Sequence, residues 1–130
     1  MKLLLDTHVW LWMRLEPAKL DSGARRKLED ASNETWISPV SAWELVQLGD
    51  RGRIRLRPEP VAWIRTALAT MKTLVAPIDI EIAIASRRIS LAHEDPADRI
   101  LAATAKVLDL TLVTADERLL ACREIRTLRA

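Results

Sequence analysis

The chain has 130 residues, of which 49% are hydrophobic and 29% are charged, and its formal net charge is +2. This composition is typical of a soluble, folded protein and excludes a disordered or fibrous one, so we expect one domain over residues 1–130. The apolar amino terminus turns polar at Asp6, too early for a signal peptide or a membrane span, which predicts a cytoplasmic protein without membrane contact.

The chain has few residues that bind soft metals or form cross-links. A single cysteine, Cys122, excludes an internal disulfide, and with only His8 and His93 beside it there is no spacing typical of a zinc site. We therefore expect any bound metal to have oxygen ligands.

The first half of the chain alternates predicted strands and helices. Residues 2–5 form a short apolar run, and residues 7–15 continue as a helix up to Glu16-Pro17. Ser38 and Pro39 are a helix-start signal, a hydroxyl cap followed by proline, so Glu44 is expected inside the helix that follows. The other predicted elements of this half are a helix over 22–31, a strand over 35–37 and a helix over 61–68.

The second half repeats the alternation. We predict strands over 74–76, 110–114 and 125–128, and helices over 79–88, 97–107 and 116–120. In the helix over 79–88, burial is expected for the apolar residues Ile80, Ile82, Ala83 and Ile84. Between the two halves, Arg51 to Arg57 alternate arginines with smaller or apolar residues, which would place the guanidinium groups on one side of an extended segment.

Strands alternating with helices predict an α/β fold, a three-layer α/β/α sandwich with a mostly parallel central sheet. Asp6 and Asp116 follow predicted strands, while Glu44 and Asp98 lie early on helices that leave the same edge of the sheet. Ligands of such sheets bind beyond the carboxyl ends of the strands, so these four acids can share one pocket. Four ionised carboxylates repel one another, which indicates either bound protons or a divalent metal ion.

Each acid also has a simpler explanation. Asp6 and Asp116 can cap the helices that follow them, and Asp95 with Asp98 has the spacing of a cap and a first-turn acid. Glu44 differs from them, because a carboxylate several residues inside a helix has no cap to serve.

Two further features suggest binding surfaces. Arginine and lysine cluster at 25–27, 51–57, 87–88 and 118–129, either as ordinary solvated faces or as a surface that attracts a polyanion such as nucleic acid. Most of the five tryptophans are expected in the core. Trp10 and Trp12 cannot both face inward from one helix, so we expect one of them on a surface that contacts a partner protein.

Four motifs follow one another along residues 3 to 116. They are Leu5-Asp6-Thr7-His8, Ser38-x-x-Ser41-x-x-Glu44, Asp95-Pro96-x-Asp98-Arg99-Ile100 and Leu112-Val113-Thr114-x-Asp116. Motifs of this kind in this order resemble PIN-domain ribonucleases, particularly bacterial toxins of the VapC type.

This resemblance implies a Mg²⁺- or Mn²⁺-dependent endoribonuclease that is toxic when free and is inhibited by a cognate antitoxin protein. Asp6, Glu44, Asp98 and Asp116 match the family's acidic, metal-binding quartet, and Thr114 matches an assisting hydroxyl residue. The resemblance also favours a homodimer. Asp95 is an additional acid, either a ligand or a helix cap, and residues 49–89 carry no family signature that would identify the RNA substrate.

The physical chemistry of phosphodiester hydrolysis agrees with this assignment, since carboxylates suit Mg²⁺ or Mn²⁺ and such an ion activates water and neutralises phosphate. We expect Asp6 and Asp98 to bind the principal ion directly. Asp116 and Glu44 would act directly or through water, and a carboxylate would accept the proton of the attacking water. The main alternative is a non-catalytic PIN-like module whose acidic pocket receives a basic peptide. A receiver-type signalling domain is a weaker alternative, because the acid pair after the first strand is missing.

Overall fold

The computed structural model describes residues 1–130. Its elements, in chain order, are β1 (Lys2–Leu5), α1 (Thr7–Leu15), the 3-10 turn η1 (Pro17–Lys19), α2 (Ser22–Glu29), β2 (Glu34–Ile37), α3 (Pro39–Asp50), α4 (Pro60–Thr70), β3 (Thr73–Val75), α5 (Ile80–Arg88), α6 (Pro96–Val107), β4 (Thr111–Thr114), α7 (Glu117–Leu120) and β5 (Arg126–Arg129). These bounds agree with the elements predicted from the sequence to within a few residues, except at 51–57.

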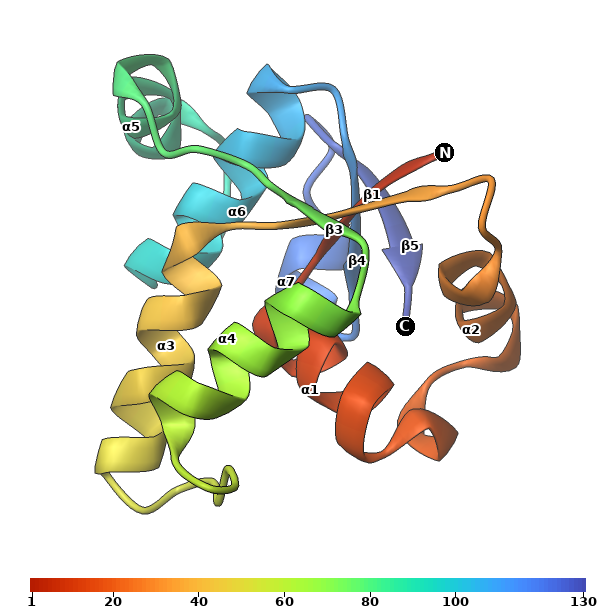
Figure 1. The fold of residues 1–130 in the computed structure, drawn as a ribbon. Coiled ribbons are helices and arrows are strands. Elements are labelled where there is room, and N and C mark those ends of the chain that lie inside the picture. The colour runs from red at the N-terminus through yellow and green to blue at the C-terminus, as the bar shows by residue number, and fades with distance from the viewer.

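The five strands form one sheet in the order β3-β2-β1-β4-β5, and every neighbouring pair is parallel (Figure 1). β1 is the central strand. Leu3 pairs with Thr35 of β2 on one side and with Thr111 of β4 on the other. The strand order reverses around β1, and a crevice at such a reversal is where parallel sheets bind ligands.

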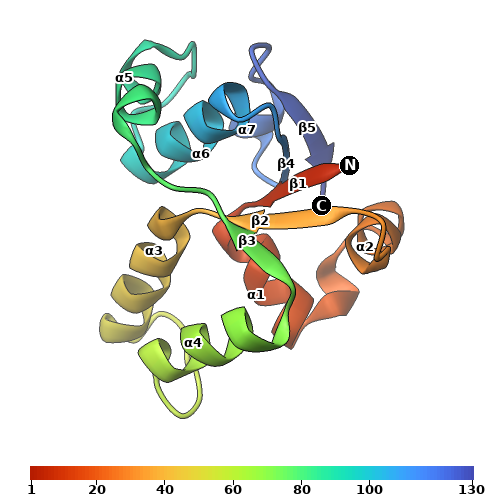
Figure 2. The ribbon, with the colours of Figure 1, turned by 45° about the horizontal axis from the view of Figure 1, so that its top comes forward.

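Helices cover both faces of the sheet, as the three-layer sandwich predicted. Figure 2 shows α5, α6 and α7 on one side of the strands and α1, α2, α3 and α4 on the other. Leu3 and Leu5 of β1 belong to the hydrophobic core beneath α1, whereas Leu4 belongs to the core beneath α6. Because both faces are covered, Leu3, Leu4 and Leu5 of β1 and Leu112 and Val113 of β4 are all buried.

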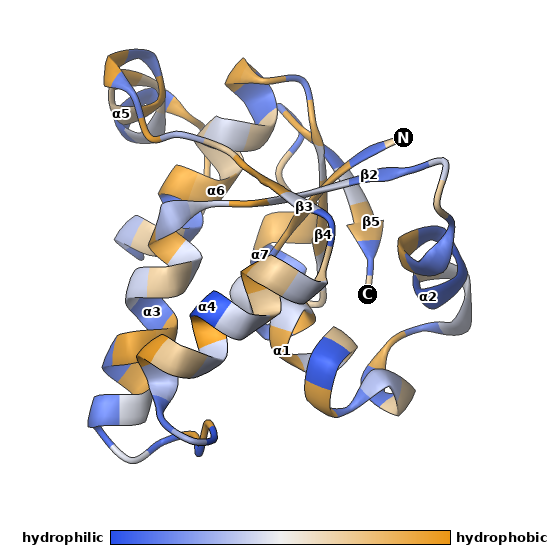
Figure 3. Ribbon diagram, in the orientation of Figure 1, coloured by the Kyte–Doolittle hydropathy of each residue, from blue (hydrophilic) through white to orange (hydrophobic).

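Helix α5 does not bury the residues that the sequence predicted. Ile82 is fully buried, but Ile80 is 74% exposed and Ile84 is 54% exposed. A helix turns by about 100° per residue, so Ile80 and Ile84 share a face roughly opposite that of Ile82. Figure 3 shows hydrophobic and hydrophilic residues mixed along α5, whereas α2 is largely hydrophilic. The buried face of α5 consists instead of Ile82 and Ser86.

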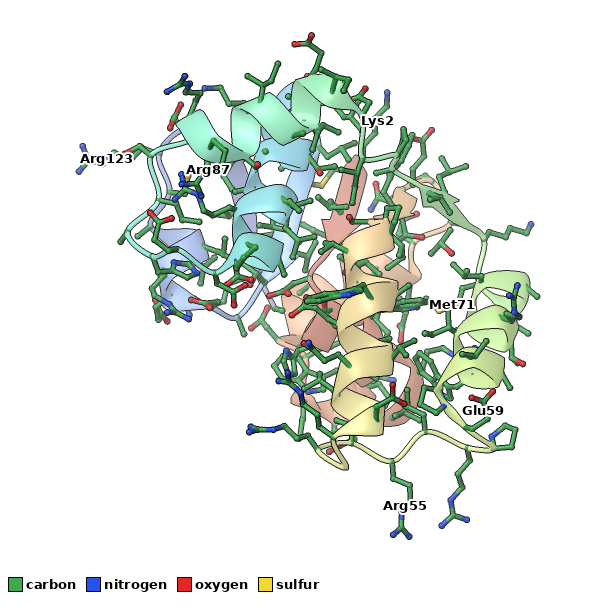
Figure 4. The ribbon with its side chains drawn as sticks, turned by 90° about the vertical axis from the view of Figure 1, so that its left-hand side faces the viewer. Lys2, Arg55, Glu59, Met71, Arg87 and Arg123 are labelled. Atoms are coloured by element: carbon green, nitrogen blue, oxygen red, sulfur yellow. The ribbon has the colours of Figure 1, made fainter.

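The arginine-rich segment 51–57 forms turns and bends, and it is not a strand. Its arginines are exposed, while Leu56 is buried and Ile54 packs against the core. Figure 4 shows Arg55 projecting from one end of the molecule, far from Arg87 and Arg123. The basic clusters therefore do not form one continuous face.

The tryptophans divide between core and surface. Trp10 and Trp63 are buried with their ring centroids 5.6 Å apart, in an edge-to-face arrangement. Trp12 is half-buried, as expected for one member of the Trp10–Trp12 pair. The most exposed tryptophan is Trp43, at 59%. None of the helices combines the length and apolar character needed to cross a membrane.

Candidate metal centre

Asp6 lies where the buried strand β1 ends and α1 begins. One carboxylate oxygen, Oδ1, accepts a hydrogen bond from the Thr7 amide at 2.7 Å, so Asp6 caps α1. The other, Oδ2, accepts from the Thr114 hydroxyl at 2.6 Å. Thr114 ends the neighbouring strand β4, and its hydroxyl also accepts from the Asp116 amide at 3.1 Å. The predicted hydroxyl residue therefore links two of the predicted acids.

Glu44 projects from the second turn of α3 toward the start of α1. Its Oε1 accepts a hydrogen bond from the Thr7 hydroxyl at 2.6 Å, and that hydroxyl also lies 2.9 Å from Ser41 Oγ. The Ser38 side chain caps α3 and Pro39 occupies its first turn, as predicted from the sequence. This start fixes the position of Glu44, which caps no helix.

Asp98 lies in the first turn of α6, and its side chain is 12% exposed. Its Oδ2 lies 2.7 Å from Nε2 of His93, a residue of the turn between α5 and α6. Asp95 precedes the helix and accepts a hydrogen bond from the Ala97 amide at 3.0 Å, so it caps α6 while also facing the same pocket.

Asp116 follows β4 and caps the short helix α7 by accepting the Arg118 amide at 2.8 Å. The Arg118 guanidinium returns to the same carboxylate, with Nη2 3.1 Å from Oδ2. This hydrogen bond is the principal reason why the pKa of Asp116 lies below its ordinary value. Asp116 is therefore the one acid of the quartet that a cation of this chain already neutralises.

The four predicted acids line one pocket of about 270 Å³. Its wall comprises Asp6, His8, Trp12, Glu44, Asp95, Asp98, Ala115, Asp116 and Arg118. Thr114 is buried behind it, within hydrogen-bond distance of Asp6. Residues as distant in sequence as Asp6 and Asp116 thus meet at the edge of the sheet where the strands end.

Burial and mutual repulsion make three of these acids difficult to ionise. Burial is the largest cause that raises the pKa values of Asp6, Glu44 and Asp98 above the ordinary carboxyl range. The negative charges of Asp6 and Asp95 raise the pKa values of Glu44 and Asp98 further. A divalent cation would remove this repulsion, and carboxylate oxygens are its preferred ligands. The residues of the pocket therefore fit a divalent metal ion.

The tightest group of ligand atoms in this pocket differs from the predicted one. Atoms of His93, Asp98 and Asp116 lie within 4.8 Å of one another, whereas Asp6 and Glu44 fall outside this group although they line the pocket. A nitrogen ligand is thus available, contrary to the expectation that only oxygen atoms are. The sequence did not predict a role for His93, because its spacing from the acids matches none of the metal-ligand motifs considered. The one sequence feature that points to the site is its place two residues before Asp95, the cap of α6.

Comparison with known proteins places these features in a family. Residues 3–124 match the PIN domain. The chain is 32% identical over 126 residues to ribonuclease VapC22 of Mycobacterium tuberculosis, an alignment that covers 95% of this chain and 93% of the relative.

Solved structures of low sequence identity share the fold. A DNA-bound VapBC from Salmonella typhimurium matches with a TM-score of 0.74 and 22% identity, over 99% of this chain and 98% of that one. VapBC2 from Rickettsia felis, bound to a promoter DNA fragment, matches with a TM-score of 0.72 and 13% identity over the same shares. Both likenesses extend across the whole sheet and its helices. These structures show the shared fold, and the match of residues 3–124 to the PIN domain shows that this chain belongs to the PIN-domain family.

Proposed function

We propose that the chain is a metal-dependent endoribonuclease that hydrolyses RNA phosphodiester bonds. The observation that carries this proposal is the convergence of Asp6, Glu44, Asp98 and Asp116 in one pocket of a PIN domain. The identity of 32% with a ribonuclease over nearly the whole chain supports RNA as the substrate.

Asp6, Asp98 and Asp116 would hold a Mg²⁺ or Mn²⁺ ion, with Glu44 acting through water. When bound, such an ion supplies a positive charge for the phosphate oxygens and a more acidic water. Glu44 is suited to accept the proton of the attacking water, because its carboxylate lines the pocket and the Thr7 hydroxyl fixes its orientation. Thr114 keeps Asp6 in place through their hydrogen bond.

The test replaces Asp98 by Asn, which removes the charge and keeps the shape. We expect Asp98→Asn to reduce cleavage of a mixed RNA in Mg²⁺ or Mn²⁺ by at least about 100-fold, since it removes a direct ligand. Asp109→Asn is the matched control, because Asp109 is exposed, pairs with Arg126 outside the pocket and has a φ of 56°, which asparagine tolerates. Wild-type cleavage by Asp98→Asn, or undiminished cleavage in EDTA, would refute the proposal.

We also propose that the chain is the toxin of a toxin–antitoxin pair. A groove of about 280 Å³ lies between α1 and the 54–56 segment, and the apolar part of its wall includes Leu11, Trp12 and Leu15. Trp12 also lines the acidic pocket, so an antitoxin segment in this groove would reach the site. The expected result is that purified antitoxin protects Trp12 from quenching and stops RNA cleavage.

A second copy of the chain would cover the exposed apolar residues of β3 and α5. β3 is an edge strand, and the exposed residues of these consecutive segments are Leu74, Val75, Ile78, Ile80 and Ile84. Exposed apolar residues on an edge strand and on the helix that follows it favour association over solvent exposure. The homodimer and the cytoplasmic location both stay predictions.

One observation favours the alternative of a non-catalytic module. Arg118 already places a guanidinium on Asp116 inside the acidic pocket, so the pocket accepts arginine side chains. Under this alternative an arginine-containing peptide binds with equal affinity in EDTA and in Mg²⁺, and no RNA is cleaved. An enzyme instead requires the ion for turnover.

A further inference from the structure

We propose that His93 is a positioning residue for Asp98: its Nε2–H donates a hydrogen bond to Asp98 Oδ2 and leaves the other carboxylate oxygen available to the metal ion. This inference rests on the proposed function, since it assigns His93 a role at the same metal centre. It goes beyond the acidic quartet, because His93 belongs to none of the four motifs.

The contact between the two side chains is short and protected from solvent. His93 Nε2 and Asp98 Oδ2 are 2.7 Å apart, and the two side chains are 11% and 12% exposed. In the metal-binding state Asp98 is ionised and has no hydrogen to give, so the imidazole is then the donor and the proton lies on Nε2. The other ring nitrogen, Nδ1, is buried without a hydrogen-bond partner. A proton on Nδ1 would be buried without an acceptor, whereas a proton on Nε2 faces Asp98 Oδ2, so the geometry places the donating N–H on Nε2.

The turn that carries His93 is held from within by Arg99, the residue after Asp98. The buried Arg99 guanidinium donates from Nε to the Ser86 carbonyl at 2.8 Å and from Nη2 to the Ile89 carbonyl at 2.8 Å. Its Nη1 reaches the carbonyl of His93 itself at 3.2 Å. Because Asp98 and Arg99 are adjacent on α6, the same helix turn fixes both the carboxylate and the backbone of its hydrogen-bond donor.

This arrangement has a chemical consequence for the site. A hydrogen bond to one carboxylate oxygen restricts rotation of the Asp98 side chain and favours its ionised form, and both effects prepare it to bind a cation. Direct coordination by His93 is the competing role, since its ring nitrogen lies within 4.8 Å of ligand atoms of Asp98 and Asp116. In the structure, however, Nε2 is already engaged with Asp98.

Two conservative variants separate these roles. In His93→Gln the side-chain amide reaches the position of Nε2 and retains a donor for Asp98, whereas in His93→Asn the shorter amide ends near the position of Nδ1. We expect His93→Asn to weaken Mn²⁺ binding, measured by calorimetry on the full chain, by about 10- to 100-fold. The Mn²⁺ affinity of His93→Gln should stay within about 3-fold of wild type, because this variant keeps the hydrogen bond to Asp98. RNA cleavage at subsaturating Mn²⁺ should follow the same order.

A tautomer measurement on the wild type does not depend on the folding of any variant. Long-range ¹H–¹⁵N NMR spectra of the metal-free chain should show His93 protonated at Nε2. A proton on Nδ1 alone would overturn the proposal. Equal Mn²⁺ affinity in wild type and both variants would also overturn it. A pulsed EPR signal from a nitrogen bound directly to Mn²⁺, present in wild type and absent in His93→Gln, would do the same. If wild type binds Mn²⁺ and cleaves RNA in these cases, the positioning role alone fails; if wild type binds no metal, the proposed function fails with it.

Discussion

At the scale of single residues, capping and site formation coincide at Asp6, Asp95 and Asp116. Each of these carboxylates caps a helix and also lines the acidic pocket. The two explanations that the sequence left open for them are thus compatible, because helices that leave one edge of a sheet begin around the same pocket. Asp98 and Glu44 cap nothing, and burial raises the pKa values of both.

The positions of the acids could be predicted because strand ends and helix starts are visible in the sequence. The position of His93 could not, since it depends on the path of the turn between α5 and α6. That path is set by hydrogen bonds from the buried Arg99 to backbone carbonyls, which leave no periodic pattern in the sequence.

The raised pKa of Glu44 implies that its charge destabilises the metal-free protein. We expect Glu44→Gln, which retains the acceptor for Thr7, to raise the melting temperature in EDTA at pH 7.5 by about 2–5 °C. The sign follows from linkage: a carboxyl whose folded pKa is raised favours the folded state at low pH and loses that contribution as pH rises. The gain should therefore shrink between pH 7.5 and pH 5, measured by calorimetry. A variant less stable than wild type at pH 7.5 would contradict this.

At the scale of elements, the order of strands and helices was predictable and the orientation of α5 was not. Apolar runs between turn signals identify β1 and β4, which are buried on both faces. In α5 the isoleucines at 80, 82 and 84 alternate, so no helical face can bury all three. Which face is buried depends on the packing of α5 against α6, which the sequence of α5 alone does not specify.

The isoleucines of α5 provide a matched pair for stability. Ile82→Ala should reduce the free energy of unfolding by about 2–4 kcal/mol, because it leaves a cavity under a fully buried side chain. Ile84→Ala, two residues away and 54% exposed, should cost less than about 1 kcal/mol. Urea unfolding at low protein concentration measures both. Equal losses would mean that the assigned faces of α5 are wrong.

At the scale of the whole molecule, the two proposed protein contacts involve helices on opposite sides of the sheet. The groove along α1 would receive the antitoxin, while the apolar residues of β3 and α5 would contact a second copy. Figure 2 shows α1 and α5 separated by the strands. The two contacts can therefore be disrupted independently.

Two charge insertions test this separation. Ile84→Glu should convert a dimer into a monomer, measured by light scattering after size exclusion. It should leave antitoxin binding within about 3-fold of wild type, because solvent and salt screen an exposed charge that lies outside the antitoxin groove. Leu15→Glu should leave the dimer intact and weaken the antitoxin complex. A dimer that survives Ile84→Glu but not Leu15→Glu would reverse the two assignments.

The most direct test of the metal centre is anomalous diffraction from a crystal of the full chain grown with Mn²⁺. The account predicts an anomalous peak inside the acidic pocket, within coordination distance of Asp6, Asp98 and Asp116. A peak confined to another part of the surface, or none at a Mn²⁺ concentration that supports RNA cleavage, would contradict it.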